Sequence, residues 1–343
     1  MHINRRTALS GFAVAAALLA SGPAQSQSVE NFYRGKTITL VVSAEPGTPT
    51  DTVARQFARF FALNIPGQPK PIVMNVGGAG GMVAAASLQT RQPSDGSAIG
   101  FLQRNNLYVP LLEQRQKNFD PREVQWIGSL DKVNYVIVAM TRSGVTTADD
   151  LLKKKLTIGA TGFSNENRLL PALLNEHVGT KMNIVPGYTG RGEVYLAMQR
   201  GEVDGWASTV EGLKEGEPAK MIADGKMKPL LTLSWKADPA LPNVPSLGAY
   251  VTQPAVKDLF DFFLSTFEAG RPIAVPKGVP RERVDALRAA FAKTVADPEF
   301  VKAITSQGFP VDPVDGTAVE QIVRKLYATP KPVLDAARRT QSQ

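Results

Sequence analysis

Residues 37–62 read TITLVVSAEPGTPTDTVARQFARFFA. Thr37 to Ala44 is a β-branched, mostly apolar run of strand length, and from Val53 onward the apolar residues recur at helical spacing. Thr50 or Asp51 is expected to cap that helix, so that the free N–H groups of its first turn face the loop Glu45 to Pro49. A helix N-terminus that follows a buried parallel strand is a place where an anion can bind.

The same order of strand, loop and helix recurs three more times along the chain. Strands are expected at 72–76, 156–159 and 182–186, and each is followed by a loop of small or polar residues and then by a helical pattern. These loops read GGAGG at 77–81, ATGFSN at 160–165 and GYTG at 187–190. Two such sets predict an α/β fold with two lobes that face each other across a cleft.

A further strand of the first set is expected at 98–103, and Arg104, Asn105 and Asn106 follow it. If this strand is parallel to its neighbours, its polar end emerges at the same sheet edge as both loops of the first lobe. Arg104 is then a candidate partner for a carboxylate, and an ordinary surface loop is the alternative. Later in the chain, 259–267 is expected to form a strand or buried segment, and helices are expected at 281–296 and 318–328.

The N-terminal 26 residues predict a cleaved export signal. Arg5 and Arg6 precede the apolar run Ala8 to Ala20, which is too short to span a bilayer, and Ala24 to Ser26 resembles a cleavage site. The arginine pair is compatible with twin-arginine or with ordinary Sec export. The mature chain is therefore expected in the periplasm, and 343 residues are enough for about two domains.

The composition also argues against several classes of site. The chain has no cysteine, and once the signal is removed His177 is its remaining histidine, so a zinc site of the usual Cys/His type is excluded and a Ser-His-Asp triad would have to use His177. The formal net charge is +8 without an aromatic-interleaved basic patch, so no nucleic acid is expected. The GGAGG loop lacks the further glycine of a dinucleotide fingerprint, because position 83 is Val83. No cofactor, no metal and no catalytic residue is predicted.

Several stretches, in their order along the chain, resemble the Bug or TctC family, the extracytoplasmic solute-binding proteins of tripartite tricarboxylate transporters. They are FYRGKTITLVVSAEPGTPTDTVAR, VGGAGGMVAA, PSDGSAIG, GYTGRGEVYLAMQRGEVDG and RPIAVPKGVPRERVDALR. The resemblance covers nearly the whole mature chain. It implies a two-lobed periplasmic-binding-protein architecture that closes over a small carboxylate. We expect lobe one at 27–131 and 263–343 and lobe two at 132–262.

The resemblance also implies which residues bind the ligand. Backbone amides of the first two loops would hold one ligand carboxylate, and the loops at 161–165 and 188–190 would contribute from the facing lobe, with an acidic residue after the following helix. Together with the cleft argument, this gives the ligand-binding candidates Glu45, Pro46, Gly47, Thr48, Asp51, Gly78, Ala79, Gly80, Arg104, Asn105, Thr161, Ser164, Asn165, Tyr188, Thr189 and Asp204.

Three positions depart from the family pattern. Thr48 replaces the second glycine of the first loop, Gly187 separates Pro186 from Tyr188, and Glu45 places a negative charge beside the expected anion site. The ligand could carry an amine or hydroxyl that Glu45 accepts, or Glu45 could point to solvent.

The sequence thus predicts a monomeric solute-binding protein that captures a small organic acid by lobe closure and delivers it to the permease subunits of a tripartite tricarboxylate transporter. Two alternatives remain open. One is an exported enzyme that uses Asp51, Glu45 or Asp204 as acid or base, and the other is a ligand-dependent sensor subunit. The sequence leaves dicarboxylate, aromatic acid and amino acid as possible ligands.

Overall fold

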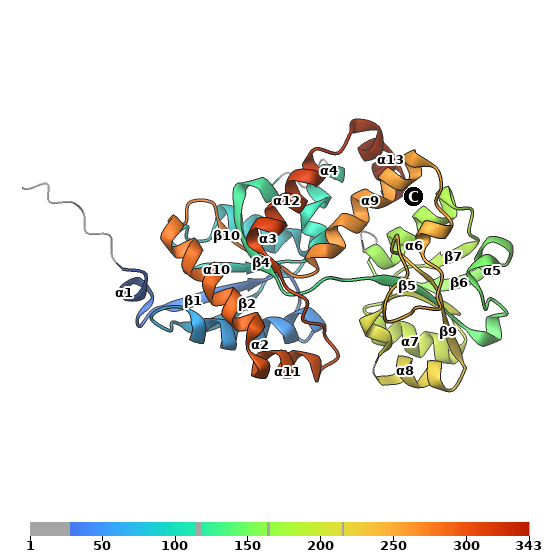
Figure 1. Cartoon of the computed structure of the whole chain (residues 1–343), viewed down its shortest axis with the longest axis horizontal. Coiled ribbons are helices and arrows are strands. Elements are labelled where there is room, and N and C mark those ends of the chain that lie inside the picture. The colour runs from blue at the N-terminus through green and yellow to red at the C-terminus, as the bar shows by residue number, and fades with distance from the viewer. Residues whose placement is uncertain (1–27, 114–117, 163–164, 215, 343) are drawn as a thin grey trace, which may run out of the picture.

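The computed structural model describes residues 28–113, 118–162, 165–214 and 216–342. The export signal expected at 1–26 lies outside these residues. Figure 1 shows two sheet-containing halves side by side, joined by extended crossings and by helices near the C-terminus. Within the described ranges, no helix is both long and apolar enough to cross a bilayer.

Each half is built on one sheet. The first has strand order β11-β4-β10-β3-β1-β2 and the second β7-β6-β8-β5-β9. The strands are β1 (Thr37–Val42), β2 (Lys70–Asn75), β3 (Ala98–Phe101), β4 (Val124–Ser129), β5 (Tyr135–Met140), β6 (Leu156–Gly159), β7 (Met182–Val185), β8 (Gly205–Thr209), β9 (Met227–Thr232), β10 (Pro272–Pro276) and β11 (Val314–Asp315). We call the half around the first sheet lobe one and the half around the second lobe two.

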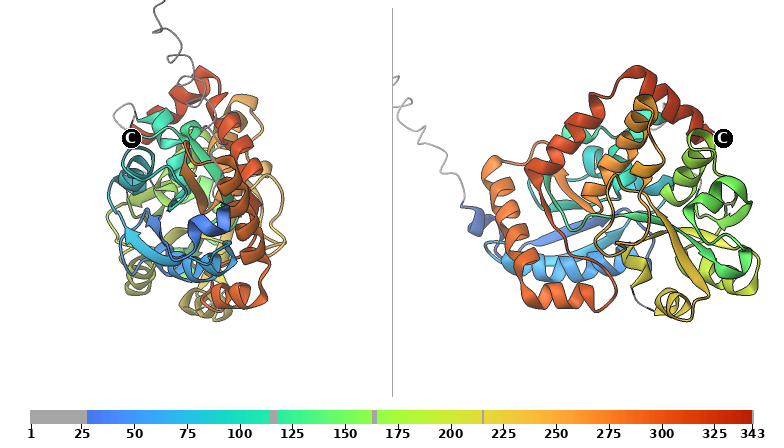
Figure 2. Two further views of the ribbon diagram at one scale, coloured as in Figure 1. Left: turned by 90° about the vertical axis from the view of Figure 1, so that its left-hand side faces the viewer. Right: turned by 45° about the vertical axis from the view of Figure 1, so that its right-hand side comes forward.

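Helices cover both sheets, as the three views in Figures 1 and 2 show. They are α1 (Val29–Tyr33), α2 (Pro49–Asn64), α3 (Met82–Thr90), α4 (Val109–Leu112), α5 (Ala148–Lys153), α6 (Glu166–His177), α7 (Arg191–Arg200), α8 (Gly216–Ala223), α9 (Pro254–Leu264), α10 (Arg281–Ala296), α11 (Pro298–Thr305), α12 (Gly316–Tyr327) and α13 (Lys331–Ser342). Short 3-10 turns fill several connections, among them η1 (Ala79–Gly81), η2 (Arg104–Leu107), η5 (Glu211–Leu213) and η7 (Ser265–Ala269).

The parallel strands expected from the sequence are present in both lobes. β1 pairs in parallel with β2 and with β3, and β6 pairs in parallel with β7 and β8. Each parallel set is completed by antiparallel strands, since β10 pairs with β3 and β4, and β5 pairs with β8 and β9. The prediction of an α/β fold with two lobes is therefore confirmed.

The chain crosses between the lobes more than once. Every strand of lobe one lies in 37–129 or in 272–315, and every strand of lobe two lies in 135–232. The lobe boundaries at 131/132 and 262/263 stay a prediction, because α9 and α13 pack against one another between the two sheets.

One local expectation is met only in part, and one was wrong. The segment expected at 259–267 as a strand or buried segment is buried, but it is helical, in α9 and η7. Pro254 begins α9, where a proline needs no hydrogen-bond partner, and the apolar face repeats at helical spacing. The cap of α2 is Thr48 rather than Thr50 or Asp51, because the Thr48 hydroxyl accepts a hydrogen bond from the Asp51 N–H at 3.3 Å.

Candidate functional site

A polar cleft of about 450 Å³ lies between the two lobes, and we call it the central cleft. It is lined by Ser43, Ala44, Glu45, Thr48, Pro49, Thr50, Gly77, Gly78, Gly80, Gly81, Leu102, Gln103, Arg104, Asn105, Tyr135, Thr161, Asn165, Glu166, Asn167, Thr189, Gly190, Arg191, Trp206, Gly270 and Arg271.

The first turns of four helical segments meet at this cleft. Lining residues come from the start of α2, from η1 leading into α3, from the start of α6 and from the start of α7. Each of these helical segments follows the carboxyl end of a parallel strand, which is why all four face the same space. Unpaired N–H groups and the positive ends of helix dipoles suit this space to a negatively charged ligand.

Asp51 holds the loop between β1 and α2 in shape. Its carboxylate accepts hydrogen bonds from the Gly47 N–H at 2.8 Å, from Arg55 Nε at 3.0 Å and from Asn75 Nδ2 at 2.9 Å. Burial raises the pKa of the Asp51 carboxyl, but the bonds from Arg55, Gly47 and Asn75 outweigh burial and leave this pKa below its ordinary value. Asp51, Pro46 and Gly47 do not line the cleft, so the structure gives Asp51 a positioning role.

Glu45 lies at the rim of the cleft and packs against the second loop. A Cβ atom added to Gly77 would fall 1.6 Å from Glu45 Oε1, so the absence of a side chain at Gly77 makes room for this carboxylate. The residue as a whole is exposed. The structure therefore leaves the Glu45 carboxylate in contact with both solvent and the cleft.

The glycine loop that follows β2 turns through left-handed conformations. Gly78, Gly80 and Gly81 have φ of 101°, 61° and 87°, which L side chains rarely adopt. Asn105 Nδ2 donates to the Gly80 carbonyl at 2.9 Å and fixes the loop to η2. Gly78, Gly80 and Asn105 line the cleft, whereas Ala79 does not.

Arg104 lines the cleft as expected, but it already has partners in lobe two. Its Nε lies 3.2 Å from Glu166 Oε1, and its Nη2 donates to Glu166 Oε2 at 3.3 Å and to the Tyr135 hydroxyl. Burial lowers the pKa of Arg104, but the adjacent Glu166 carboxylate outweighs burial and holds this pKa above its ordinary value. Arg104 is thus a charged link between the lobes.

Lobe two presents a network of amides and hydroxyls to the cleft. The Thr161 hydroxyl accepts from Asn165 Nδ2 at 2.7 Å, and the Thr161 N–H donates to Asn167 Oδ1 at 3.0 Å. Thr189 precedes α7, and its N–H donates to Glu193 Oε2 at 2.6 Å. Thr161, Asn165 and Thr189 line the cleft, and Ser164 lies outside the described residues.

Two candidates lie away from the cleft. The Tyr188 ring packs against Gly159, where an added Cβ would lie 3.2 Å from the ring, and it contributes to the core of lobe two. Asp204 precedes β8 and forms an ion pair with Arg142 at 3.0 Å. The Asp204 N–H bonds to Thr157 early in β6, whereas the cleft-lining Thr161 follows the end of that strand. The structure therefore does not bring Tyr188 or Asp204 to the cleft.

The family model described as "Tripartite tricarboxylate transporter family receptor" matches residues 53–337. This chain belongs to that family. Its members are extracytoplasmic solute-binding proteins, so both fold and family are those of binding proteins.

Individual relatives agree with the assignment of this receptor to the family. It is 27% identical over 318 residues to a UPF0065 protein in the tcbD-tcbE intergenic region of Pseudomonas sp. (strain P51), covering 90% of this chain and 87% of the relative. A TctC solute-binding protein from Polaromonas superposes with a TM-score of 0.68 at 21% identity, covering 89% of this chain and 99% of the other.

Two further structures of similar fold are of proteins with a bound or accompanying organic acid. One from Rhodopseudomonas palustris is described with adipate and has a TM-score of 0.66 at 18% identity, covering 90% of this chain and 97% of the other. MatC from the same species is described with bound malate and has a TM-score of 0.62 at 19% identity, covering 89% and 99%. At these identities the likeness shows the fold.

The receptor's cleft also contains Arg191, which the sequence offers as a possible charge partner, and Glu166 and Arg271, which are absent from the candidates predicted by sequence. Arg271 lies beside the buried Asp131, and Nη1 of Arg271 forms an ion pair with its carboxylate. Burial, together with the nearby Arg104, lowers the pKa of Arg271 to about 10. Arg191 begins α7, and Glu166 begins α6. A weak signal was present for Arg191 and Glu166, because both follow the predicted loops directly, but no pattern in the sequence places Arg271 at the cleft.

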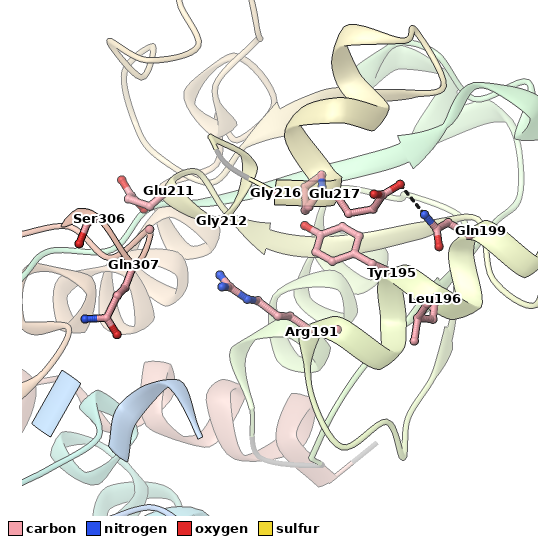
Figure 3. Close-up of a pocket in the computed structure, with 13 residues that line it drawn as sticks. Arg191, Tyr195, Leu196, Gln199, Glu211, Gly212, Gly216, Glu217, Ser306 and Gln307 are labelled. Atoms are coloured by element: carbon pink, nitrogen blue, oxygen red, sulfur yellow. Dashed lines mark hydrogen bonds between the residues drawn. The ribbon is translucent and has the colours of Figure 1, made fainter. Parts of the chain in front are cut away.

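A second cavity of about 410 Å³, here named the side crevice, opens between the lobes of the receptor (Figure 3). It is lined by Arg191, Gly192, Tyr195, Leu196, Gln199, Glu211, Gly212, Gly216, Glu217 and Pro218 of lobe two and by Ser306, Gln307 and Gly308 of lobe one. Arg191 lines both cavities. Among the described side chains, His, Cys, Asp and Glu form no group of three that could hold a metal ion.

Proposed function

We propose that this receptor captures a small organic acid in the central cleft by closing its lobes, and that the closed form delivers the acid to the permease subunits of a tripartite tricarboxylate transporter. The observation that carries the proposal is the meeting of four helical N-termini from two lobes at one polar cleft. A ligand that contacts both lobes stabilises the closed arrangement over the open one, and this difference in affinity drives closure.

The malate and adipate of similarly folded proteins support a carboxylate as the ligand here. We assign ligand contacts to Thr48, Gly78 and Gly80 from lobe one and to Thr161, Asn165 and Thr189 from lobe two, since all of them line the cleft. Asp51 and Asp204 are each held in hydrogen bonds or ion pairs away from the cleft, which argues against acid–base catalysis by these groups. We propose a periplasmic location, export with a cleaved signal, and no catalytic step.

The test is a thermal melting panel on the purified mature chain. Mono-, di- and tricarboxylates, aromatic acids and amino acids are compared with matched neutral amides such as adipamide. A ligand at 100 times its dissociation constant adds about 2.7 kcal/mol of stability. Stabilisation by acids and not by their amides supports the proposal. Stabilisation by neutral compounds alone, or chemical conversion of the bound acid, contradicts it.

Delivery to a transporter needs its own measurement. Membranes that contain the permease should take up the radiolabelled acid only in the presence of this receptor, and detergent extracts should yield the permease on a column of the ligand-loaded receptor. Recovery of a membrane sensor in place of the permease would favour the sensory alternative.

A further inference from the structure

The side chain of Arg104 crosses from lobe one to lobe two. Arg104 begins η2, which follows β3 of lobe one. Its Nε lies 3.2 Å from Oε1 of Glu166 at the start of α6, and its Nη2 donates to Glu166 Oε2 and to the hydroxyl of Tyr135 at the start of β5. Among the described residues, every hydrogen bond and ion pair of the Arg104 side chain therefore reaches lobe two.

The Arg104 guanidinium also lies over the segments that cross between the lobes. Its carbon is 5.4 Å from the ring centre of Tyr135 and 6.0 Å from that of Phe267, and the two ring centres are 5.1 Å apart. Tyr135 begins β5 just after the chain enters lobe two, and Phe267 lies in η7 shortly before the chain returns to lobe one in β10. Hydrogen bonds weaken steeply beyond about 3.5 Å, so a small rotation of one lobe about these crossings breaks the contacts of Arg104.

The Arg104–Glu166 pair is shielded from water although both residues line the central cleft. The exposed fraction is 20% for the Arg104 side chain and 8% for the Glu166 side chain. A buried charge that loses its partner is strongly destabilised, whereas both charges regain water when the lobes move apart. Contact between η2 and α6 therefore requires both charges together.

The competing role for Arg104 is direct contact with the acid, and the two roles differ in what removal of Glu166 does. If Arg104 binds the acid, loss of the Glu166 carboxylate frees the guanidinium and removes a negative charge from an anion site, so affinity rises. If the pair joins the lobes, the same loss leaves Arg104 unbalanced in the joined arrangement, so affinity falls. The sign of the change in affinity therefore distinguishes the two roles.

We propose, on the basis of the proposed function, that Arg104 and Glu166 are positioning residues: their pair, with the Tyr135 hydroxyl, joins the two lobes in the arrangement that binds the acid. The apparent affinity of a receptor is its intrinsic affinity multiplied by the fraction of molecules in the binding-competent arrangement. The pair sets this fraction without touching the ligand. Its loss weakens the binding of every acid by the same factor, whatever the size or charge of the acid.

The test compares the mature receptor with Glu166→Gln, which keeps the shape of the side chain and removes its charge. Calorimetry measures the affinities for succinate, adipate and any further acid that stabilises the receptor in the melting panel. Small-angle X-ray scattering measures the radius of gyration with and without each acid. Tyr135→Phe is a second, milder variant, which removes only the hydroxyl that accepts from Arg104 and carries the test if Glu166→Gln does not fold.

The matched control is Glu320→Gln. Glu320 pairs with Arg288 at 2.7 Å between α12 and α10, and both helices pack on β4 of lobe one. Both residues lie outside the central cleft and the side crevice. Glu320→Gln therefore removes an ion pair within one lobe, where Glu166→Gln removes one between lobes.

Glu166→Gln should bind every acid on the order of 10-fold more weakly, with factors that agree within about 2-fold from one acid to the next. Its unliganded form should have a larger radius of gyration than the unaltered receptor, and the two acid-saturated forms should agree. Tyr135→Phe should show smaller changes in the same direction. Glu320→Gln should match the unaltered receptor in both measurements.

Tighter binding of acids by Glu166→Gln overturns the positioning role and makes Arg104 a ligand contact. A loss confined to one acid, or unchanged affinity with unchanged scattering, also overturns it, and each of these results leaves the receptor function standing. If the unaltered receptor binds no acid, the proposed function fails. The scattering of the unliganded variants then still decides whether the pair joins the lobes, because that measurement needs no ligand.

Discussion

At the scale of single residues, Asp51 is the clearest case of a side chain that shapes the site without lining it. Its carboxylate joins Gly47 in the loop, Arg55 one turn along α2 and Asn75 at the end of β2. Asn75 in turn donates to the Ala44 carbonyl at 3.1 Å. One buried carboxylate therefore determines the relative position of the first two cleft loops.

Replacing Asp51 with Asn should destabilise the protein by about 1–3 kcal/mol at pH 7, because an amide NH2 would face groups that are themselves donors. The pKa of Asp51 is lower in the folded protein than the unfolded value of about 3.9. Its contribution is therefore complete above that value and is lost as the pH falls through the folded pKa. Urea unfolding of both proteins at pH 7 and pH 3 measures the difference, which should shrink at pH 3. A difference of equal size at both pH values would contradict this account.

The residues of the site divide into those that sequence could predict and those that it could not. Thr48, Gly78, Gly80, Thr161 and Thr189 follow strands and precede helices, so the order of elements alone directs them to the cleft. The pairing of Arg104 with Glu166 joins segments that are far apart in the chain and in different lobes. No local pattern encodes such a contact.

The same limit explains the remaining differences at the residue scale. Asp204 follows the right helix in sequence, but it is at the start of β8, where Arg142 pairs with it. Arg271 follows η7 and begins the return crossing to lobe one, a position without any helical or strand periodicity.

At the scale of elements, Thr48 connects the cap of α2 to the first cleft loop. Its hydroxyl accepts from the Asp51 N–H and donates to the Glu45 carbonyl at 2.8 Å. A glycine at this position would make neither bond. Compared with a glycine, Thr48 therefore restricts the backbone of the loop and adds two hydrogen bonds from its hydroxyl group.

Thr48→Ala should cost about 1 kcal/mol of stability through loss of the cap, and should also weaken ligand binding several-fold because the loop loses its contact with Glu45. Thr147→Ala is the matched control, since Thr147 caps α5 with a bond from the Asp150 N–H at 3.2 Å and lies outside the central cleft. Chemical denaturation and calorimetry should show a similar stability loss in both variants, with reduced affinity only for Thr48→Ala. Unchanged affinity in Thr48→Ala would limit Thr48 to capping.

Among elements, sequence periodicity located β6 and α6 at their observed bounds but did not identify α9 and α13 as helices. The α9 sequence PAVKDLFDFFL is dense in aromatic residues, so its helical repeat is hard to distinguish from a buried strand. α13 reads KPVLDAARRTQS and has few apolar residues to mark a face. Both helices owe their position to packing against each other and against distant parts of the chain.

At the scale of the whole molecule, one cluster of buried apolar side chains extends through both lobes, beside a further cluster within each lobe. The shared cluster runs from Trp126 in β4 through Phe263 in α9 to Ile137 in β5 and Leu173 in α6. α13 spans the same region: Arg338 donates to the Leu111 carbonyl of α4 at 2.7 Å, and Thr340 donates to Glu176 of α6 at 2.7 Å. The lobes are thus coupled through α13 and this cluster. Glu176 lies at the end of α6 that is opposite to its cleft-lining start.

Because of this shared cluster, the receptor should unfold in one cooperative transition. Differential scanning calorimetry should give a single peak whose calorimetric and van't Hoff enthalpies agree, and a bound acid should move the entire peak upward. Two separate peaks, with only one shifted by the ligand, would show that the lobes are energetically independent.

The order of strands in lobe one has a consequence for how the chain is made. β10 lies between β4 and β3, and apart from β10 the partner of β4 is β11, which comes later still. A ribosome releases 37–129 long before 272–276, so β3 and β4 remain unpaired on the sides that β10 will occupy. The second sheet is complete once β9 ends at Thr232. The lobe encoded second therefore has all its strands first, and the sheet that begins the ligand site stays incomplete until β10 and β11 have been synthesised.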